Sequence, residues 1–273
     1  MTAHSTHVLT FNLNNPGRER AERQLTYLAA RPEQILVLTE TANSAGCAYL
    51  EREFTQAGYS VTFPRPERRE RGVMIVSRLA TRPLTTHITY LPHRAAGVTV
   101  DTEHGPLDVI GLYVPSRDAS EAKTERKARF LRECRDVLPF QRTGMRIVLG
   151  DLNVLEPAHN PRYRFFRPFE YGFYSWFDEA GYVDAFRHLH PDALDYSWVG
   201  RTGDGYRYDH AHVSRHLAEY LRGCAYVHEP RTMDERLTDH SALTVTAALA
   251  PTGALTVTAP ATAPEPARAP ALF

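Results

Sequence analysis

The sequence is poor in several features that would assign a chain to a class of protein at once. It holds only 3 cysteines, Cys47, Cys134 and Cys224, which are too few and too widely spaced for a disulfide framework or a cysteine metal site. No apolar run approaches the roughly 18 residues that a membrane-spanning helix needs. The N-terminus has neither the basic region nor the apolar stretch of a secretory signal. These absences predict a protein of the bacterial cytoplasm that does not associate with a membrane.

The chain also lacks net charge. Its 32 basic residues balance its 32 acidic ones, so the overall charge does not indicate nucleic-acid binding, although a local basic groove is compatible with it. Lysine is nearly absent, with only Lys123 and Lys127, which we attribute to GC-rich coding. Apolar residues make up 42% of the chain, enough for the core of one large domain.

Strand-like and helix-like segments alternate along most of the chain. Helical spacing of apolar residues predicts helices near 21–29, 44–57, 124–138 and 170–180. Short apolar runs predict strands at 7–13, 34–40, 59–63, 72–77, 96–101, 107–114, 146–150, 195–199, 206–213, 223–228 and 241–249. This order predicts an α/β fold, a four-layer αββα sandwich in which two mixed β-sheets pack face to face with helices outside. Residues 1–250 would form the folded domain, and the Ala- and Pro-rich residues 251–273 a disordered tail.

Polar side chains stand where many of the predicted strands end. The stretch IVLGDLNVL (147–155) delivers Asp151 and Asn153 two positions apart, directly after an apolar run. Because side chains alternate along a strand, we expect these two to point the same way. The other such residues are Asn12, Asn14, Glu40, Tyr113, Arg207, Asp209, Asp239 and His240. Each alone is typical of a turn or a cap, but together they predict a site.

The stretch YDHAHVSRH suggests a competing zinc site. His210 and His212 would lie on one face of a strand, where they could bind zinc together. Asp209 would face the other way, and neither a cysteine nor a further acidic residue is spaced to complete the set. Carboxylates and amides without thiolates favour a hard cation instead, Mg²⁺ or alternatively Mn²⁺.

The motifs and their order resemble the endonuclease/exonuclease/phosphatase superfamily over about residues 7–249. The matching stretches are FNLNN, LTET, GVMIVSR, GLYVPS, LGDLNV, GYVDAFRHLHP, YSWVG, YRYDHAHVS and LTDHSAL. The segments GYVDAFRHLHP, YSW and YRYD are most similar to exodeoxyribonuclease III and the abasic-site endonucleases. The resemblance implies a monomeric, Mg²⁺-dependent phosphodiester hydrolase. Its expected partner is double-stranded DNA with abasic sites, in DNA repair, with 3′–5′ exonuclease activity as a further reaction.

The resemblance also implies roles for the metal-binding and water-activating residues. Glu40 would be the main metal ligand, with Asn12 beside it and Asp239 binding the metal directly or through water. Asp151 would position or deprotonate the attacking water. Asn153 would hold the phosphate, or hold Asp151 in register.

The remaining roles concern the phosphate and the rest of the substrate. His240 would contact the scissile phosphate with its tautomer set by Asp209, and Tyr113 would donate to a phosphate oxygen. Whether Asp151 or the Asp209–His240 pair supplies the base stays open. The predicted substrate contacts are Asn14, Arg117, Trp198 and Arg207, with exposure to solvent as the alternative for Arg117 and core packing for Trp198.

The sequence departs from the family pattern mainly at its substrate-facing surface. Ser116 and Arg117 follow GLYVP where relatives usually carry asparagine, and no lysine stands two positions after Glu40. Residues 156–173 replace a segment that in relatives helps to build the DNA-facing surface. These departures keep open a phosphodiesterase or phosphatase that acts on a small-molecule or lipid phosphoester. A non-catalytic DNA-binding or scaffold protein is a third hypothesis, which the complete set of acids, amides and histidine disfavours.

Overall fold

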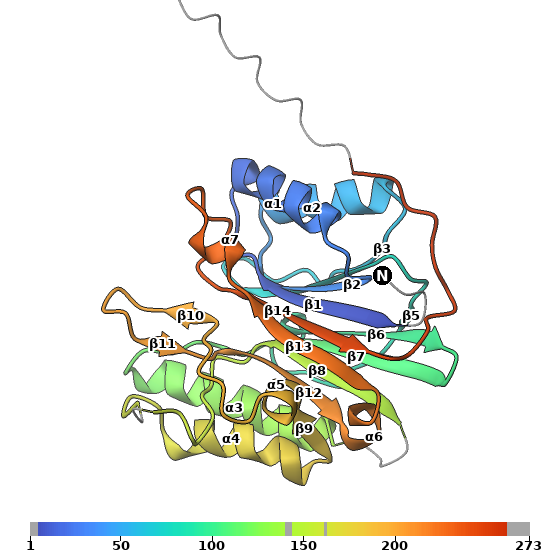
Figure 1. Cartoon of the computed structure of the whole chain (residues 1–273). Helices are drawn as coiled ribbons and strands as arrows, with labels where there is room; N and C mark the ends of the chain where they lie inside the picture. The colour runs from blue at the N-terminus through green and yellow to red at the C-terminus, as the bar shows by residue number, and fades with distance from the viewer. Residues whose placement is uncertain (1–4, 140–143, 161–162, 261–273) are drawn as a thin grey trace, which may run out of the picture.

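The computed structural model describes residues 5–139, 144–160 and 163–260 of the chain. Two six-stranded sheets pack face to face, with α1 (Arg18–Ala30) and α2 (Ala45–Gln56) outside one sheet and α3 (Glu121–Val137) and α4 (Pro168–Glu179) outside the other (Figure 1). This arrangement confirms the predicted αββα sandwich.

The first sheet has the strand order β13-β14-β1-β2-β4-β3, and the second has the order β5-β6-β7-β8-β12-β9. Both sheets are mixed, since β1 pairs parallel with β2 and β7 parallel with β8, while the other pairs are antiparallel. The strands of the first sheet are β1 (Thr6–Asn12), β2 (Ile35–Thr41), β3 (Ser60–Thr62), β4 (Gly72–Ser77), β13 (Leu221–Val227) and β14 (Ala242–Ala247). Those of the second are β5 (Arg82–Pro83), β6 (Ala95–Thr102), β7 (Gly105–Tyr113), β8 (Met145–Asp151), β9 (Tyr182–Asp184) and β12 (Asp209–Ser214).

The remaining elements are short. They are the two-stranded hairpin β10 (Trp198–Val199) and β11 (Gly205–Tyr206), the 3₁₀ turn η1 (Pro92–Arg94), and the helices α5 (Ala185–Leu189), α6 (Arg215–Ala218) and α7 (Glu229–Thr232). Periodicity does not reveal such elements, because segments of two to five residues complete too little of a repeat. The predicted strand 206–213 is therefore divided between β11 and β12.

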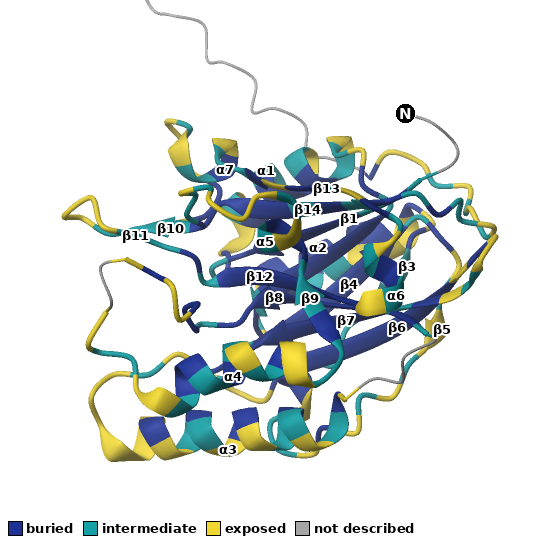
Figure 2. Ribbon diagram, turned by 60° about the horizontal axis from the view of Figure 1, so that its bottom comes forward, coloured by how far each residue is buried: buried dark blue, intermediate teal, exposed yellow. Residues whose placement is uncertain are grey.

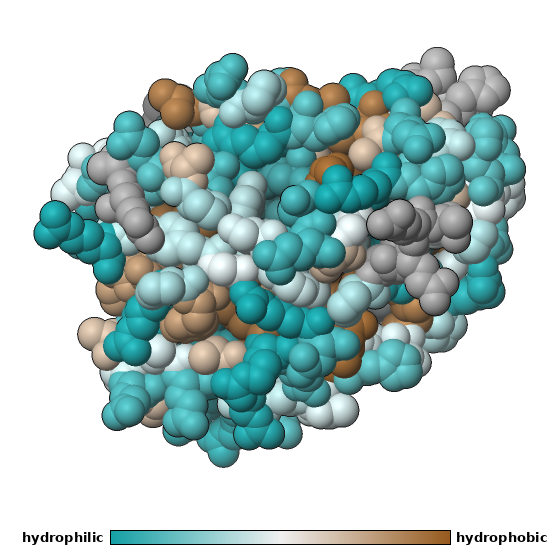
Figure 3. All heavy atoms as spheres, turned by 90° about the horizontal axis from the view of Figure 1, so that it is seen from below, coloured by the Kyte–Doolittle hydropathy of each residue, from teal (hydrophilic) through white to brown (hydrophobic). Residues whose placement is uncertain are grey.

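The central strands are buried on both faces, which explains their continuous apolar runs (Figure 2). Alternate residues of each strand enter different cores: Val8 points between the sheets, whereas Leu9 points toward α1 and α2. The second sheet divides Ile147 and Val148 in the same way, with Val148 toward α3 and α4. All three cysteines are buried and free. On the side of α3 and α4 that faces away from the sheets, the surface is mainly hydrophilic (Figure 3).

The boundary predicted at residue 250 is too early. Residues 251–258 continue across the body of the domain, where Thr252 donates to Asp101, Leu255 donates to Arg78, and Thr258 donates to Ala57 through backbone hydrogen bonds. The predicted tail thus begins with a segment that is held by the domain, and residues 261–273 lie outside the described part. Across the described residues, the helices are all too short or too polar to span a membrane.

Candidate active site

Six chain segments deliver polar side chains to the same end of the sandwich. Strands β1, β2, β7 and β8 finish there, and their last or next-to-last residues are Asn12, Glu40, Tyr113 and Asp151. Strand β12 begins there because it runs antiparallel to β8, and its Asp209 is paired with Asp151. The segment before β14 brings Asp239 and His240 to this end for the same reason. The fold therefore brings together every strand-end position that the sequence singled out, apart from Arg207.

Asn12 links the two sheets at this end. Its Nδ2 donates to Glu40 Oε1 at 3.2 Å and to Asp151 Oδ2 at 3.1 Å. Its Oδ1 accepts a hydrogen bond of 2.8 Å from the backbone of Asn14. Asn14 Nδ2 in turn donates to Asp239 Oδ1 at 2.9 Å, and Trp198 Nε1 lies 3.4 Å from Asp239 Oδ2. One chain of amides and carboxylates thus connects Glu40, Asp151 and Asp239.

Glu40 occupies a backbone conformation that is uncommon for its residue type. Its φ is +51°, and the pairing of β2 with β4 shifts register between Leu38 and Thr41 around it. A glutamate in the left-handed region is strained, and such strain persists where the surrounding structure enforces it, often at functional sites. Asn14 and Asn153 also have positive φ, at +49° and +48°. The irregularity turns the Glu40 side chain out of the alternation of β2 and toward Asn12.

Asp151 and Asn153 lie together for a different reason from the one predicted. Strand β8 ends at Asp151, so strand alternation does not extend to Asn153. Instead, Asp151 Oδ1 accepts a hydrogen bond of 3.0 Å from the backbone N–H of Asn153, which has left-handed φ. This is a side-chain turn of the kind that Asp forms readily. Asn153 Nδ2 donates to Val114 O at 3.1 Å, which fixes the amide at the rim of the site.

Gly150 is the residue that permits this strand end. Its φ is +142°, and a Cβ there would lie 2.1 Å from the carbonyl oxygen of Leu112 on β7. We expect Gly150→Ala to destabilise the fold by about 2–3 kcal/mol, through backbone strain and overpacking. Urea denaturation checks this. Gly223→Ala is the matched control, because a Cβ at Gly223 would meet only ordinary contacts of 3.6 Å; equal effects of the two changes would contradict the explanation.

His240 and Asp209 form a buried pair. His240 Nδ1 lies 2.7 Å from Asp209 Oδ2, and the two residues are 6% and 1% exposed. Burial disfavours the imidazolium, but the charge and hydrogen bond of Asp209 outweigh it and raise the pKa of His240 to about 10. Asp209 is held by Ser197 Oγ, which accepts from its backbone N–H, and by Tyr226, whose hydroxyl donates to its carbonyl. His240 is therefore a cationic donor near neutral pH.

Burial shapes the other two titrating groups of the site. The pKa of the Asp151 carboxyl is raised well above its ordinary value by burial and by the charge of Asp209, with a further contribution from Glu40. Burial and the charges of Glu40 and Asp151 likewise raise the pKa of the Tyr113 hydroxyl. Tyr113 thus remains a hydrogen-bond donor, and Asp151 is a more basic carboxylate than an exposed aspartate.

The donor set at this end suits a divalent cation. Among the described residues, no lysine or arginine forms an ion pair with Glu40, Asp151 or Asp239. The His240 cation offsets these carboxylates only in part, because burial and the charge of Asp209 still raise the pKa of Asp151. Carboxylate and amide oxygens are hard ligands, which Mg²⁺ and Mn²⁺ prefer. The residues present therefore fit the predicted metal.

A cavity of about 250 Å³ is lined by Glu40, Asp151 and His240 of this set. Sequence reasoning did not identify much of its lining, notably Lys127, Phe165, Phe166 and Tyr208. Lys127 had a detectable signal, because it lies on the buried stripe of α3 with Leu131 and Cys134, where a charge needs a partner.

Lys127 and Arg117 both bind the buried carboxylate of Glu170. Lys127 Nζ lies 2.7 Å from Glu170 Oε1 and 2.5 Å from the carbonyl oxygen of Asn153. Arg117 Nε and Nη2 donate to Glu170 Oε2 at 3.0 and 2.6 Å, and the Arg117 side chain is only 2% exposed. Arg117 lines the cavity, so the alternative of a solvated arginine is wrong. This ion cluster joins α3, α4 and the loop after β8 beneath the site.

Comparison with known proteins agrees with this geometry. The model described as the endonuclease/exonuclease/phosphatase family matches residues 9–257. The chain belongs to this family. It is accordingly a phosphoesterase, of a family that is generally metal-dependent. Among curated proteins, the search found no match to the chain.

Solved structures show the same family fold. An AP endonuclease from Archaeoglobus fulgidus aligns with a TM-score of 0.75 and 24% identity, covering 88% of this chain and 98% of that chain. A Neisseria 3′ phosphatase bound to a product DNA hairpin aligns with the same TM-score and coverage at 23% identity. An AP endonuclease from Leishmania major gives a TM-score of 0.72 and 19% identity, covering 90% of this chain and 88% of that chain.

In this family member, Arg207 does not face the catalytic cavity, and the prediction that it contacts substrate is wrong. It precedes β12, and its side chain is 1% exposed. Its guanidinium donates to Glu156 at 3.0 and 3.3 Å and to Asp184 Oδ2 at 2.8 Å. Arg207 therefore neutralises two buried carboxylates inside the domain, which is a structural role.

The structure places a third candidate ligand, which the sequence spacing did not reveal, beside the two histidines of the competing zinc site. Asp184 on β9 lies beside His210 and His212, and the three ligand atoms lie within 4.8 Å of one another. Asp209 does face the other way, toward His240. The Asp184 carboxylate, however, already accepts hydrogen bonds from Arg207, Tyr174 and the backbone of Arg187. We therefore assign this trio to the polar interior of the second sheet.

Glu156 is the first residue of the divergent segment 156–173, and its side chain ties this start of the segment to the domain. Arg187 donates to its two carboxylate oxygens at 2.7 and 2.6 Å, and Arg207 donates to both as well. Burial favours the neutral acid, but the hydrogen bonds of Arg187 and the charge of Arg207 outweigh it and lower the pKa of Glu156 from 4.5 to about 2. The start of the segment is thus held by a carboxylate that stays ionised in mild acid.

This depressed pKa predicts a pH-dependent contribution to stability. Because the folded-state pKa lies below the unfolded one, the contribution is complete above pH 4.5 and is lost as the pH falls toward about 2. We expect Glu156→Gln to destabilise the protein at neutral pH and to cost progressively less across that acid range. Urea denaturation of both proteins over the range measures this. A difference in stability that does not change with pH would contradict it.

Proposed function

We propose that this protein is a divalent-metal-dependent nuclease that cleaves double-stranded DNA at abasic sites, as a monomer, in DNA repair. Removal of nucleotides from 3′ ends would be a further reaction of the same site. The observation that carries the proposal is the position of Asn12, whose amide bridges Glu40 and Asp151 beside the Asp209–His240 pair. A cation site and a proton-transfer site thus meet at one point, as hydrolysis of a phosphodiester requires.

Glu40, Asn12 and Asp239 would hold Mg²⁺ or Mn²⁺. When bound, the cation would supply Lewis-acid stabilisation of charge on the phosphate and leaving-group oxygens. The chain of hydrogen bonds through Asn12 and Asn14 orients all three residues toward the same end of the sandwich.

The raised pKa of His240 favours Asp151 over the Asp209–His240 pair as the base. An imidazolium whose pKa is about 10 has no lone pair to accept a proton at neutral pH. It can donate to a phosphate oxygen, with Asp209 keeping it charged and oriented. We therefore assign the attacking water to Asp151, whose raised pKa makes it the stronger proton acceptor. Tyr113, which stays protonated, is the second donor to the phosphate.

The walls of the cavity suit a nucleic acid better than a strongly charged small phosphate. Arg117 and Lys127 are both engaged with Glu170, so the cavity offers little unpaired positive charge. Its rim carries Trp198, Tyr208 and Phe166. Such rings favour contact with a sugar or a base. Trp198 is half-buried at the cavity rather than in the core, which favours substrate contact over core packing.

Cleavage of a labelled duplex that carries one abasic-site analogue tests the proposal. We expect incision beside the analogue with Mg²⁺ and none with EDTA. An intact duplex, together with turnover of a small phosphodiester such as bis(p-nitrophenyl) phosphate, would overturn the DNA assignment. It would favour the alternative in which the family chemistry serves a small-molecule or lipid phosphoester.

A further inference from the structure

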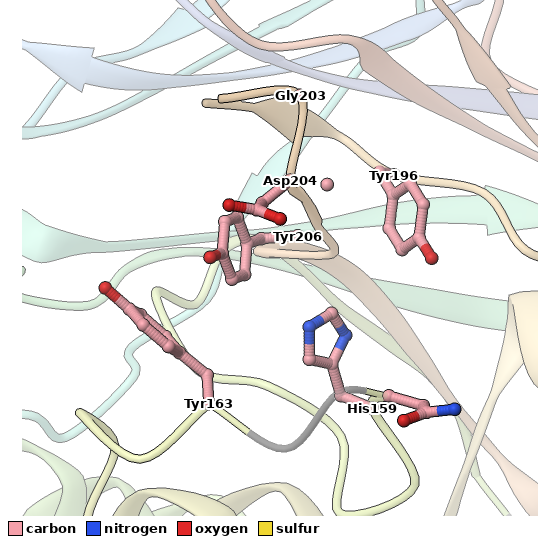
Figure 4. A pocket seen from close by; sticks show the side chains of 8 residues that line it. His159, Tyr163, Tyr196, Gly203, Asp204 and Tyr206 are labelled. Atoms are coloured by element: carbon pink, nitrogen blue, oxygen red, sulfur yellow. The ribbon is translucent and has the colours of Figure 1, made fainter. Parts of the chain in front are cut away.

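A second cavity of about 260 Å³ lies beside the catalytic cavity and has no part in the chemistry described above. Its described wall is formed by residues 159, 160 and 163, which follow β8, and by the β10–β11 hairpin with Tyr196 just before it (Figure 4). The residues that line it are His159, Asn160, Tyr163, Tyr196, Gly203, Asp204, Gly205 and Tyr206, which we call the hairpin pocket.

The rings of the hairpin pocket surround open space instead of filling a core. Figure 4 shows His159, Tyr163, Tyr196 and Tyr206 around one cavity, with Asp204 on the side of Tyr206. Tyr163 is 39% exposed, while Tyr196 and Tyr206 are half-buried. His159 lies at 27° to Tyr206 with 5.5 Å between ring centroids, and Tyr163 lies 5.1 Å from Tyr206. Several aromatic rings that converge on a water-accessible cavity are typical of a site for a flat, apolar ligand.

The hairpin adds polar groups at the mouth of this pocket. The backbone N–H of Gly200 donates to Asp204 O at 2.8 Å, and Thr202 Oγ1 donates to Asp204 Oδ2 at 2.6 Å, which together fix the turn. Asp204 is exposed, so its carboxylate is available to N–H donors of a ligand. Burial lowers the pKa of His159, which keeps its ring uncharged at neutral pH.

The hairpin pocket adjoins the catalytic cavity. Tyr163 lines both. A row of rings also joins them: Trp198 and Tyr208 at the catalytic cavity have centroids 6.0 Å apart, and Tyr208 is parallel to Tyr206 at 5.5 Å. The two cavities therefore lie next to each other along one row of aromatic rings, with Tyr163 in the wall of both.

We propose that the hairpin pocket binds one nucleobase of the nucleotide next to the scissile phosphate, with its ring against the aromatic walls and its N–H groups toward Asp204. The size supports this class of ligand, since 260 Å³ is below the roughly 300–1,000 Å³ of pockets for drug-sized molecules. It suits a single base, not a base pair. The substrate would then carry an intact, unpaired base beside the cleaved bond. The inference rests on the proposed function, because it takes the phosphate in the catalytic cavity to be that of a nucleotide.

Binding measurements in EDTA test the pocket without depending on catalysis. The probes are the four 2′-deoxynucleoside 5′-monophosphates and 2-deoxyribose 5-phosphate, which lacks a base, titrated calorimetrically into the full-length protein. Stacking of a base on aromatic side chains contributes about 1–3 kcal/mol, so the base should increase affinity by roughly tenfold or more. Tyr206→Leu should remove most of this advantage. Asp204→Asn, at an exposed turn that tolerates the change, should alter the order of preference among the bases.

Tyr220→Leu is the control, because Tyr220 lies just before β13, outside both cavities. Equal binding of deoxyribose phosphate and all four nucleotides would overturn the inference, as would an undiminished base advantage in both the Tyr206 and Asp204 variants. Failure of the proposed function has a different signature. If the abasic duplex stays intact while nucleotides bind through Tyr206, the pocket stands and the duplex substrate is wrong. If the duplex is cleaved but the base adds no affinity, only the pocket is wrong.

Discussion

Replacing Asp151 by asparagine is expected to reduce Mg²⁺-dependent cleavage of the abasic duplex by about 10³-fold. The change keeps the shape of the side chain and one acceptor oxygen, which can still accept from the Asn153 N–H, but it replaces the oxygen that accepts from Asn12 by an NH₂ donor. It removes the group that accepts a proton from the attacking water, and proton transfer by one positioned group contributes about 10²–10⁴-fold. Initial rates with enzyme in excess over DNA would measure the effect on the chemical step.

The matched control for Asp151→Asn is Asp192→Asn, which makes the same change at an exposed position outside the site. Its rate should equal that of the wild type. Thermal unfolding of both variants separates a loss of chemistry from a loss of fold. Removing a buried carboxyl with a raised pKa should leave Asp151→Asn at least as stable as the wild type. A rate within tenfold of the wild type would exclude Asp151 as the base.

Replacing Arg207 by methionine is expected to destabilise the protein by about 3–5 kcal/mol. Met fills much of the same volume but leaves the carboxylates of Glu156 and Asp184 buried with one cation fewer. Removing one partner of a buried ion pair has a cost of this order because the remaining charge is uncompensated. Urea denaturation at neutral pH measures it.

Arg215→Met provides the comparison, since Arg215 pairs with Asp178 where both side chains are more than half exposed. Such a surface pair contributes at most about 1 kcal/mol. The two arginines thus differ in burial and not in chemistry. If Arg207→Met instead left stability unchanged and raised KM for DNA, the guanidinium would be a substrate contact and the structural role assigned here would be wrong.

The ion cluster beneath the site could be predicted only in part from the local sequence. It consists of Lys127, Arg117 and Glu170. Lys127 stands out on an apolar helix stripe, but its partner is on another helix 43 residues away. Spacing within one helix cannot identify that partner, because the contact depends on how α3 and α4 pack. The same holds for Asp184, whose pairing with Arg207 joins a three-residue strand to a loop.

The sequence by itself determined the layered α/β fold and the set of polar residues that meet at one end of the sandwich. Both follow from local patterns: apolar runs buried on two faces identify central strands, and acids or amides directly after them fall at a common sheet edge. Tertiary structure alone decided which side chains face the cavity. It turned Glu40 inward through a left-handed backbone, placed Asn153 in a turn beyond β8, and buried Arg207 against two acids. It also placed the β10–β11 hairpin against the loop after β8, which forms the aromatic pocket. These outcomes depend on register shifts and packing between distant segments, which no single stretch of sequence contains.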